Sequence, residues 1–154
     1  STIESNTDIG YSPVCPQPSL DVRHLLRIPE DFAIAPEVED EFECLNLDIT
    51  SPPKSNTEGP LPVLIWIHGG SQIVTFCSAA SKICDPTKIV ADSIKARKPL
   101  IFVSINYRLN IFSFGDGKER NLALKDQRLA IEWVRQNIAG FGGDPVSQMY
   151  SFFC

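Results

Sequence analysis

The sequence predicts an α/β fold with a central, mainly parallel sheet. Two runs are apolar on both faces, as expected of buried parallel strands: residues 63–67 in "VLIWIHGG" and residues 99–109, "PLIFVSINYRL". Helical periodicity follows each run, so the order of elements is strand, helix, strand, helix. That order is typical of parallel strands joined by right-handed crossover helices.

The segments before the first of these strands are expected to be mostly irregular. Residues 1–36 are rich in Ser, Pro and Asp without a sustained period, and we expect loops with short extended pieces there. Residues 44–49, "CLNLDI", alternate apolar and polar residues and predict a strand. The turn-rich stretch "SPPKSNTEGPLP" separates this strand from the apolar run that follows.

A short helix is expected between the two apolar runs. Asp85 and Pro86 supply an N-cap and a first-turn proline, which mark the start of a helix. On that helix, one face is expected to carry Ile89, Val90 and Ile94.

A longer helix is expected over residues 121–139. Gly140 follows it, where the end of a helix favours a left-handed residue. Apolar residues recur in this segment at spacings of three and four, the pattern of a helix with one buried face. These residues are Leu122, Leu129, Ala130, Trp133, Val134 and Ile138.

Composition and charge exclude several classes of function. The 154 residues carry 14 basic and 19 acidic side chains, and the net charge of -5 argues against nucleic-acid binding. No apolar stretch approaches the roughly 20 residues that span a bilayer. The two histidines, His24 and His68, are far apart and no CxxC pair exists, so neither a metal nor a cofactor is expected.

The five cysteines leave several pairings open. An odd number leaves at least one thiol unpaired if the others form disulfides. Cys77 and Cys84 could bridge or could remain two half-buried thiols, and Cys154 has no assigned partner.

The strand end "HGGS", residues 68–71, is the candidate for chemistry. Ligands of such sheets bind beyond the carboxyl ends of the strands, and glycines let backbone N–H groups approach a ligand. Adjacent N–H groups can stabilise the oxyanion formed when a carbonyl is attacked, although the same residues could be a tight turn only. Ser71 is not expected to be a nucleophile, because "GGSQI" has Ile73 where the G-x-S-x-G elbow requires glycine.

Several phrases together resemble the type-B carboxylesterases, the family of lipases and cholinesterases on the α/β-hydrolase fold. They are "VCPQ", "ECLNLDI", "PVLIWIHGG", "VSINYRL" and "NLALKDQRLAIEWVRQNIAGFGGDP", and their order and spacing match over nearly all of residues 11–145. The resemblance predicts that residues 1–145 are the N-terminal portion of an α/β-hydrolase domain. Residues 146–154 form a tail without resemblance to the family.

The resemblance implies a disulfide and an oxyanion hole. It pairs Cys15 with Cys44, a link that should stabilise the fold by about 3 kcal/mol and that implies an extracellular, secreted protein. The hole would use the backbone N–H groups of Gly70 and Ser71, with Gly69 giving clearance and His68 preceding it.

The resemblance also implies two structural roles. The family pairs the arginine at the position of Arg108 with a glutamate where this chain has Phe42, so Glu41 or Glu43 would have to replace that partner. Asp126 and the following glutamine match an Asp-Gln pair of the family for which we expect a structural role.

The implied function is hydrolysis of a carboxylic ester or lipid by a serine nucleophile in the full-length protein. The Gly-Glu-Ser-Ala-Gly elbow of the family is absent from this chain, as are the acid and the base histidine. We therefore expect this portion to be inactive alone. The alternatives are a non-catalytic binding or adhesion protein of cholinesterase type, and a mis-spliced or pseudogene product.

The tail has a specific expected origin and consequence. Val146-Ser147 can be encoded by a splice-donor sequence, so a retained intron would explain residues 146–154. Loss of the nucleophile strand would leave the strand at residues 101–105 without one neighbour, and an open apolar edge promotes association.

Overall fold

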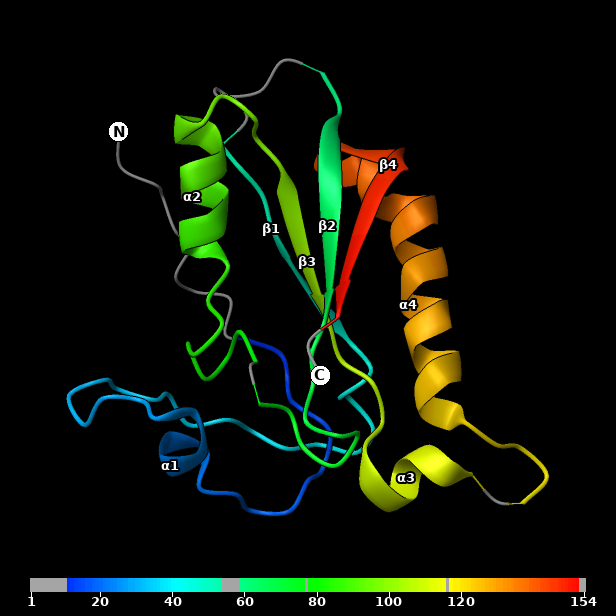
Figure 1. Cartoon of the computed structure of the whole chain (residues 1–154). Coiled ribbons are helices and arrows are strands. Elements are labelled where there is room, and N and C mark those ends of the chain that lie inside the picture. The colour runs from blue at the N-terminus through cyan, green and yellow to red at the C-terminus, as the bar shows by residue number, and fades with distance from the viewer. Residues whose placement is uncertain (1–10, 54–58, 77, 116, 153–154) are drawn as a thin grey trace.

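The computed structural model describes residues 11–53, 59–76, 78–115 and 117–152. Figure 1 shows its helices and strands along the chain. In order, they are α1 (Val22–Leu26), β1 (Leu47–Thr50), β2 (Leu61–Ile67), α2 (Thr87–Lys95), β3 (Ile101–Ile105), α3 (Asn110–Phe114), α4 (Leu122–Asn137), the 3₁₀ helix η2 (Ile138–Phe141) and β4 (Gly143–Phe152). The expectations for residues 1–10 and for Cys77 and Cys154 lie outside the described residues.

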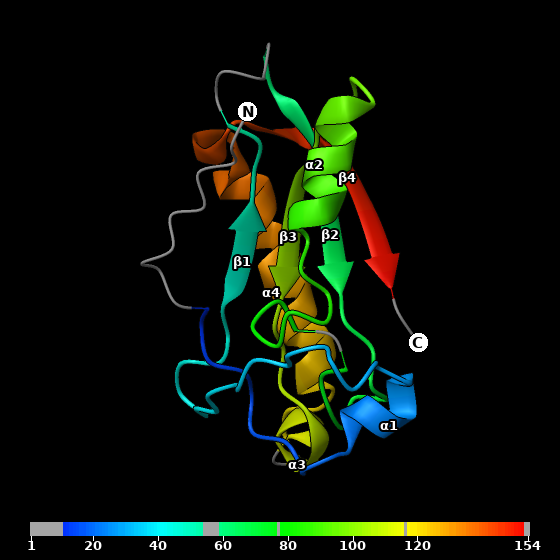
Figure 2. The same ribbon diagram turned by 90° about the vertical axis from the view of Figure 1, so that its left-hand side faces the viewer.

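A four-stranded sheet with the order β1-β3-β2-β4 organises the molecule. β2 runs parallel to both β3 and β4, whereas β1 is antiparallel to β3. α2 covers one face of the sheet and α4 covers the other, as the two views in Figures 1 and 2 show. The expected α/β fold with a mainly parallel sheet and crossover helices is therefore confirmed.

The core lies between the sheet and α4. The odd-numbered residues of β2 and β3 are buried in one cluster with residues of α4 and η2, because side chains alternate along a strand. Burial of each such aliphatic side chain contributes about 1.5–3 kcal/mol to stability. The cluster includes Val63, Ile65, Ile67, Ile101, Val103, Ile105, Val134 and Ile138.

α4 buries a narrower stripe than its apolar pattern predicts. Ala123, Asp126 and Val134 are buried, whereas Leu129 is 56% exposed and Trp133 is 40% exposed. The expectation that Leu129 and Trp133 belong to the buried face is therefore wrong. Apolar residues at helical spacing show that α4 has an apolar face, but only part of that face is buried against the sheet.

The ends of the two main helices also differ from expectation. Gly140 lies within η2, and the left-handed residue that ends this segment is Gly142, with φ 86°. After α4 the chain makes one 3₁₀ turn, so the left-handed residue that ends the helical segment lies two residues later than predicted. On α2, Val90 is buried but Ile89 is 48% exposed, so the expected shared face of Ile89 and Val90 is also wrong.

β4 contains most of the residues of the expected tail. Residues 148–152 pair with β2 in parallel register, with Ile65 opposite Tyr150, and an irregularity lies near Leu61. β3 has β1 on one side and β2 on the other. The expected open edge at residues 101–105 is therefore wrong, because β4 adds to the far side of β2. The edge strands of the sheet are β1 and β4, and on β4 Met149 is 68% and Phe152 is 64% exposed.

A disulfide joins Cys15 and Cys44, as the resemblance implied. Their Cα atoms are 4.7 Å apart and both residues are buried. The N–H of Val14 donates to the carbonyl of Val38 at 2.9 Å, and the N–H of Asp40 donates to the carbonyl of Val14 at 3.2 Å. The disulfide therefore closes the loop that carries α1, and backbone hydrogen bonds support its base.

Candidate active site

The glycine pair after β2 forms a tight turn at the carboxyl end of the parallel strands. The carbonyl of Gly70 accepts hydrogen bonds from the N–H of Ile73 at 2.9 Å and from that of Val74 at 3.2 Å. Gly70 has φ 121°, and a Cβ built there would lie 1.9 Å from the carbonyl oxygen of Val74. Only glycine fits this position, because both the backbone angle and the close approach exclude a side chain.

Ser71 and Gln72 follow Gly70 in the left-handed conformation. Their φ angles are 56° and 59°, which costs roughly 1–2 kcal/mol for each non-glycine residue. Both residues are exposed. Within the described part of the chain, the N–H groups of Gly70 and Ser71 donate to no backbone carbonyl. The turn thus leaves two adjacent backbone N–H groups without a backbone acceptor among the described residues.

Replacing Ser71 with glycine is expected to stabilise the protein. The change removes about 1–2 kcal/mol of left-handed strain, and the greater freedom of the unfolded chain takes back about 0.4–1 kcal/mol. We expect a net increase of roughly 0.5–1 kcal/mol in the free energy of unfolding, measured by urea denaturation. A loss of stability in Ser71→Gly would show that the Ser71 side chain contributes more than its backbone strain costs.

His68 lies beneath the turn as a neutral, packed side chain. It is buried, and its ring stacks on that of Tyr107 with centroids 4.3 Å apart. Its Nδ1 lies 3.1 Å from the carbonyl oxygen of Gly69, and its Nε2 lies 3.4 Å from Oγ1 of Thr75. Since a carbonyl only accepts, Nδ1 carries the proton of the neutral ring. The hydroxyl of Tyr107 donates to the carbonyl of His68 at 2.6 Å.

Burial gives His68 a pH-dependent effect on stability. Desolvation lowers its pKa to about 4, although the hydrogen bond with the carbonyl of Gly69 acts in the opposite direction and raises the pKa. Because the unfolded chain binds this proton more readily, stability is complete above the unfolded pKa of 6.5 and falls as pH drops from 6.5 to about 4. The loss is about 3 kcal/mol in total.

The measurement is the free energy of unfolding of wild type and His68→Gln between pH 4 and 8. Burial raises the pKa values of Glu37 and Asp48, which gives these carboxyl groups the opposite dependence on pH. The difference between the two proteins isolates the histidine, because both share these carboxyl groups. Parallel pH profiles for the two proteins would contradict a buried neutral His68.

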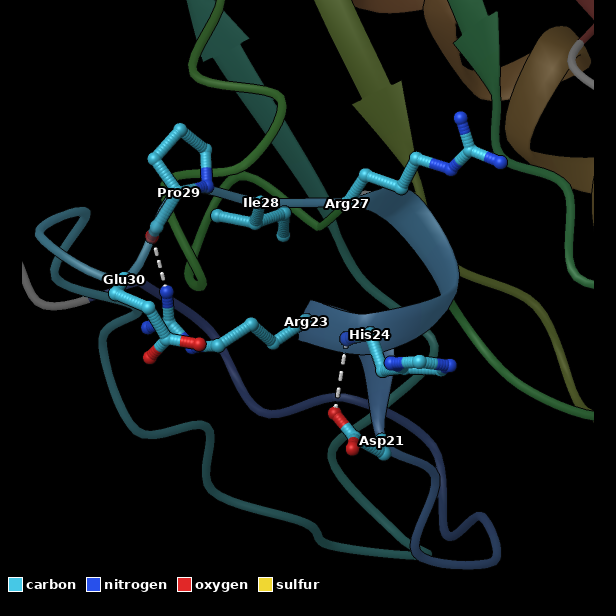
Figure 3. Close-up of a pocket in the computed structure, with 7 residues that line it drawn as sticks. All are labelled: Asp21, Arg23, His24, Arg27, Ile28, Pro29 and Glu30. Atoms are coloured by element: carbon cyan, nitrogen blue, oxygen red, sulfur yellow. Dashed lines mark hydrogen bonds between the residues drawn. The ribbon is translucent and has the colours of Figure 1, made fainter.

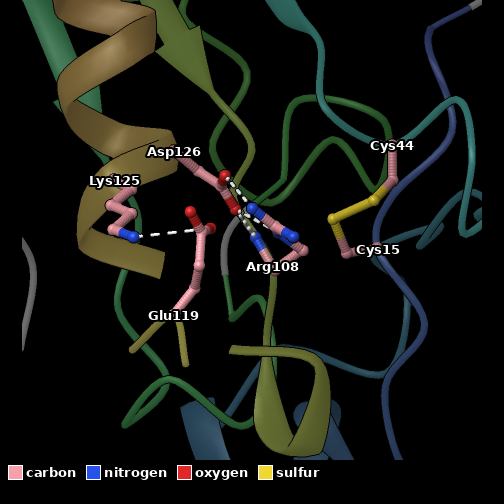
Figure 4. A network of polar contacts seen from close by, with 6 residues as sticks. All are labelled: Cys15, Cys44, Arg108, Glu119, Lys125 and Asp126. Carbon is pink, nitrogen blue, oxygen red and sulfur yellow. Dashed lines mark hydrogen bonds and ion pairs between the residues drawn. A yellow bond between two sulfur atoms is a disulfide. The ribbon is translucent and has the colours of Figure 1, made fainter. Parts of the chain in front are cut away.

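Arg108 forms its ion pair with Asp126 from α4. Its Nε donates to Oδ2 of Asp126 at 2.8 Å and its NH2 group donates to Oδ1 at 2.6 Å, as Figure 4 shows. The backbone N–H of Arg108 also donates to Oδ2, at 3.1 Å. Neither Glu41 nor Glu43 is its partner, so that expectation is corrected. Asp126 has the structural role that was expected for it.

Two residues that the sequence did not single out, Gln17 and Asn110, hold the turn. Oε1 of Gln17 accepts the N–H of Thr75 at 2.5 Å, and the N–H of Asn110 donates to the carbonyl of Gln72 at 2.7 Å. These contacts join segments that are far apart in the sequence, and single hydrogen bonds to backbone leave no periodic pattern. The one available signal was the position of Gln17 within "VCPQ".

The described residues also form a cavity of about 520 Å³ around α1. Its lining includes Asp21, Arg23, His24 and Glu30. Figure 3 shows that Arg23 reaches across to the carbonyl of Pro29; it also donates to Phe32 at 2.8 Å. His24 is exposed and uses its backbone N–H to bond Asp21, so this cavity has no assembled catalytic group.

The described residues offer neither a metal-binding cluster nor a membrane-spanning helix. They contain no group of three or more His, Cys, Asp or Glu side chains placed to hold a metal ion. None of the helices that the structure describes is both long and apolar enough to cross a membrane.

Comparison with known proteins identifies the family. The sequence model described as "Carboxylesterase family" matches residues 9–147. The chain belongs to this family. Among solved structures, a "PNB ESTERASE" superposes with a TM-score of 0.70 at 32% identity, over 93% of this chain and 26% of that one. The strands and helices therefore form part of an α/β-hydrolase fold.

Fungal members of the carboxylesterase family are among the relatives. "Lipase 5" of Diutina rugosa is 36% identical over 151 residues, which cover 94% of this chain and 26% of the relative. "Inactive carboxylesterase-like protein VdtD" of Byssochlamys spectabilis is 36% identical over 85% of this chain and 22% of its own length. "Secreted lipase 1" of Botryotinia fuckeliana (strain B05.10) is 43% identical over 67% of this chain and 18% of its own. The chain thus spans about a quarter or less of these relatives.

Proposed function

We propose that this chain supplies the oxyanion-binding half of a carboxylic ester hydrolase. The observation that supports the proposal is the turn after β2, at the carboxyl end of that strand, where the N–H groups of Gly70 and Ser71 donate to no backbone carbonyl of the described residues. When a nucleophile attacks an ester carbonyl, negative charge develops on the carbonyl oxygen. Two fixed N–H donors would stabilise that charge by about 3 kcal/mol each.

The other supporting residues shape this turn and do not move protons. Gly69 lets the backbone approach a ligand, and neutral His68 fills the space below it. The 154 residues contain no G-x-S-x-G sequence. The nucleophilic serine, the acid and the base histidine would therefore come from the remainder of the full-length protein. The substrate would be a small carboxylic ester or a lipid.

An oxidising environment fits the proposal. The disulfide between Cys15 and Cys44 and the similarity to a protein named as a secreted lipase support an extracellular location. We further propose that residues 1–145 are the esterase portion and residues 146–154 a tail of separate origin. A genomic sequence without a splice donor at codons 146–147 would remove the retained-intron explanation for the tail.

The test of the function is hydrolysis of short-chain and long-chain p-nitrophenyl esters by the full-length protein. We expect turnover that a serine-directed phosphonate abolishes, and no such turnover from residues 1–154 alone. The test variant in the full-length protein is Gly70→Ala, which alters the turn itself. Its matched control is Gly142→Ala, a change far from the turn. Turnover that survives the phosphonate would overturn the serine mechanism.

A non-catalytic binding protein is the second candidate. It is favoured by the similarity to a protein named as an inactive carboxylesterase-like protein, which covers 85% of this chain. The two candidates differ at the elbow position of the full-length protein. A serine there, together with phosphonate labelling, supports the hydrolase, whereas another residue supports the binding protein.

A further inference from the structure

The side chain of Gln17 and the backbone of Asn110 hold the turn after β2 against the segment that follows Cys15. Gln17 accepts the N–H of Thr75 through Oε1 at 2.5 Å. Asn110 donates its backbone N–H to the carbonyl of Gln72 at 2.7 Å, and its Nδ2 donates to the carbonyl of Pro16 at 2.8 Å. Asn110 therefore connects the turn to the same segment from which Gln17 reaches it.

The segment of residues 13–17 is itself firmly anchored. Cys15 forms the buried disulfide with Cys44. Next to it, the carbonyl of Pro13 accepts hydrogen bonds from Nδ2 of Asn46 at 2.7 Å and of Asn106 at 3.3 Å. These asparagines adjoin the ends of β1 and β3, so the anchor is fixed to the sheet.

The turn needs such external support because it is strained. Ser71 and Gln72 are both left-handed without being glycine, a conformation that is strained for residues with a side chain. Hydrogen bonds with Gln17 and Asn110 hold Thr75, just after the strained residues, and Gln72, the second of them. Each bond opposes this strain.

We propose that Gln17 and Asn110 are positioning residues for the oxyanion turn, and that the Cys15–Cys44 disulfide acts on the turn through Gln17. Together they form a clamp that fixes the direction of the N–H groups of Gly70 and Ser71. The catalytic consequence of the clamp rests on the proposed function, whereas its effect on the turn does not.

Hydrogen–deuterium exchange on the full-length protein tests the clamp without any reaction. We expect the peptide of residues 68–76 to exchange about fivefold faster in Gln17→Ala and in Asn110→Gly, with β2 unchanged. Glycine at position 110 keeps the left-handed backbone but removes the amide, so it tests the side chain alone. Gln17→Glu retains an acceptor oxygen and should restore nearly wild-type exchange.

Gln136→Ala is the matched control, since Gln136 is exposed on α4. Faster exchange confined to residues 68–76, and absent from the control, supports the clamp. Wild-type exchange in both Gln17→Ala and Asn110→Gly would overturn it. Faster exchange in β2 as well would also overturn it, because the two residues would then stabilise the whole sheet.

The link to the disulfide is tested with Cys15→Ser/Cys44→Ser. We expect this variant to speed exchange in residues 68–76, and Gln17→Ala to add little to it, because both changes release the same contact. Fully additive effects would show that the disulfide does not act through Gln17.

Kinetics of the full-length protein provide the last test. We expect Gln17→Ala to lower kcat about tenfold or more with KM nearly unchanged, because the hole binds charge that develops only in the transition state. An altered KM with unchanged kcat would contradict a positioning role. If the wild-type protein hydrolyses no ester, the proposed function fails, and the exchange measurements still decide whether the clamp exists.

Discussion

Replacing Gly70 with alanine is expected to lower the free energy of unfolding by about 3 kcal/mol or more. The φ of 121° is strained for any residue with a side chain, and the new Cβ would lie 1.9 Å from the carbonyl oxygen of Val74. That oxygen belongs to the backbone of the same turn and cannot move aside alone. The turn must rearrange, and we expect the N–H groups of Gly70 and Ser71 to lose their directions. Urea denaturation measures the stability.

Two other glycines separate the angle from the steric overlap. Gly142 has φ 86° with open space around its Cβ position, so Gly142→Ala should cost about 1 kcal/mol from the angle alone. Gly140 has an ordinary angle and open space, and Gly140→Ala should change stability little. If Gly70→Ala costs no more than Gly142→Ala, the close approach to Val74 is not a feature of the folded protein.

Arg108→Met is expected to destabilise the protein by about 3–5 kcal/mol, the usual cost of leaving one buried charge unpaired. The side chain of Asp126 is 2% exposed, and three hydrogen bonds from Arg108 satisfy its carboxylate. Methionine keeps much of the volume of arginine but removes two of those donors. The free energy of unfolding from urea denaturation measures the loss.

Asp126→Asn, which changes the other partner of the pair, should cost less than Arg108→Met. The side chain of Arg108 is 33% exposed, so its charge can turn toward water when the carboxylate is removed. Arg128→Met is the control, because Arg128 and its partner Glu132 are both mostly exposed and such pairs contribute about 0–1 kcal/mol. A cost below about 1 kcal/mol for Arg108→Met would place its pair among those surface pairs.

The two central strands, β2 and β3, were predictable because burial on both faces leaves a direct mark on the sequence, whereas β4 was not predicted. Residues 63–67 lie in β2 and residues 101–105 form β3, both within the predicted apolar runs. The buried face of α4 was only partly predictable. Leu129 and Trp133 have the spacing of core residues, but which flank of a helix meets the sheet depends on tertiary packing.

The candidate site was predictable where local chemistry defines it. The glycine pair at the end of an apolar run left open a tight turn or a pair of N–H donors; the tight turn is present, and the donor role stays a prediction. The partner of Arg108 was not predictable, because Asp126 reaches it from another element. The same holds for Gln17 and Asn110, whose contacts with the turn depend on the fold bringing three segments together.

The order of the strands in the sheet has a consequence for synthesis of the protein on the ribosome. β1 and β2 are consecutive in the sequence, yet β3 lies between them, and β4 joins the outer side of β2. A nascent chain that has emerged only as far as α2 therefore holds two strands that do not pair in the native sheet. Native strand pairing begins only when β3 emerges and pairs with both at once. Until then the apolar residues of β2 are unprotected, and the chain would depend on chaperones during this interval.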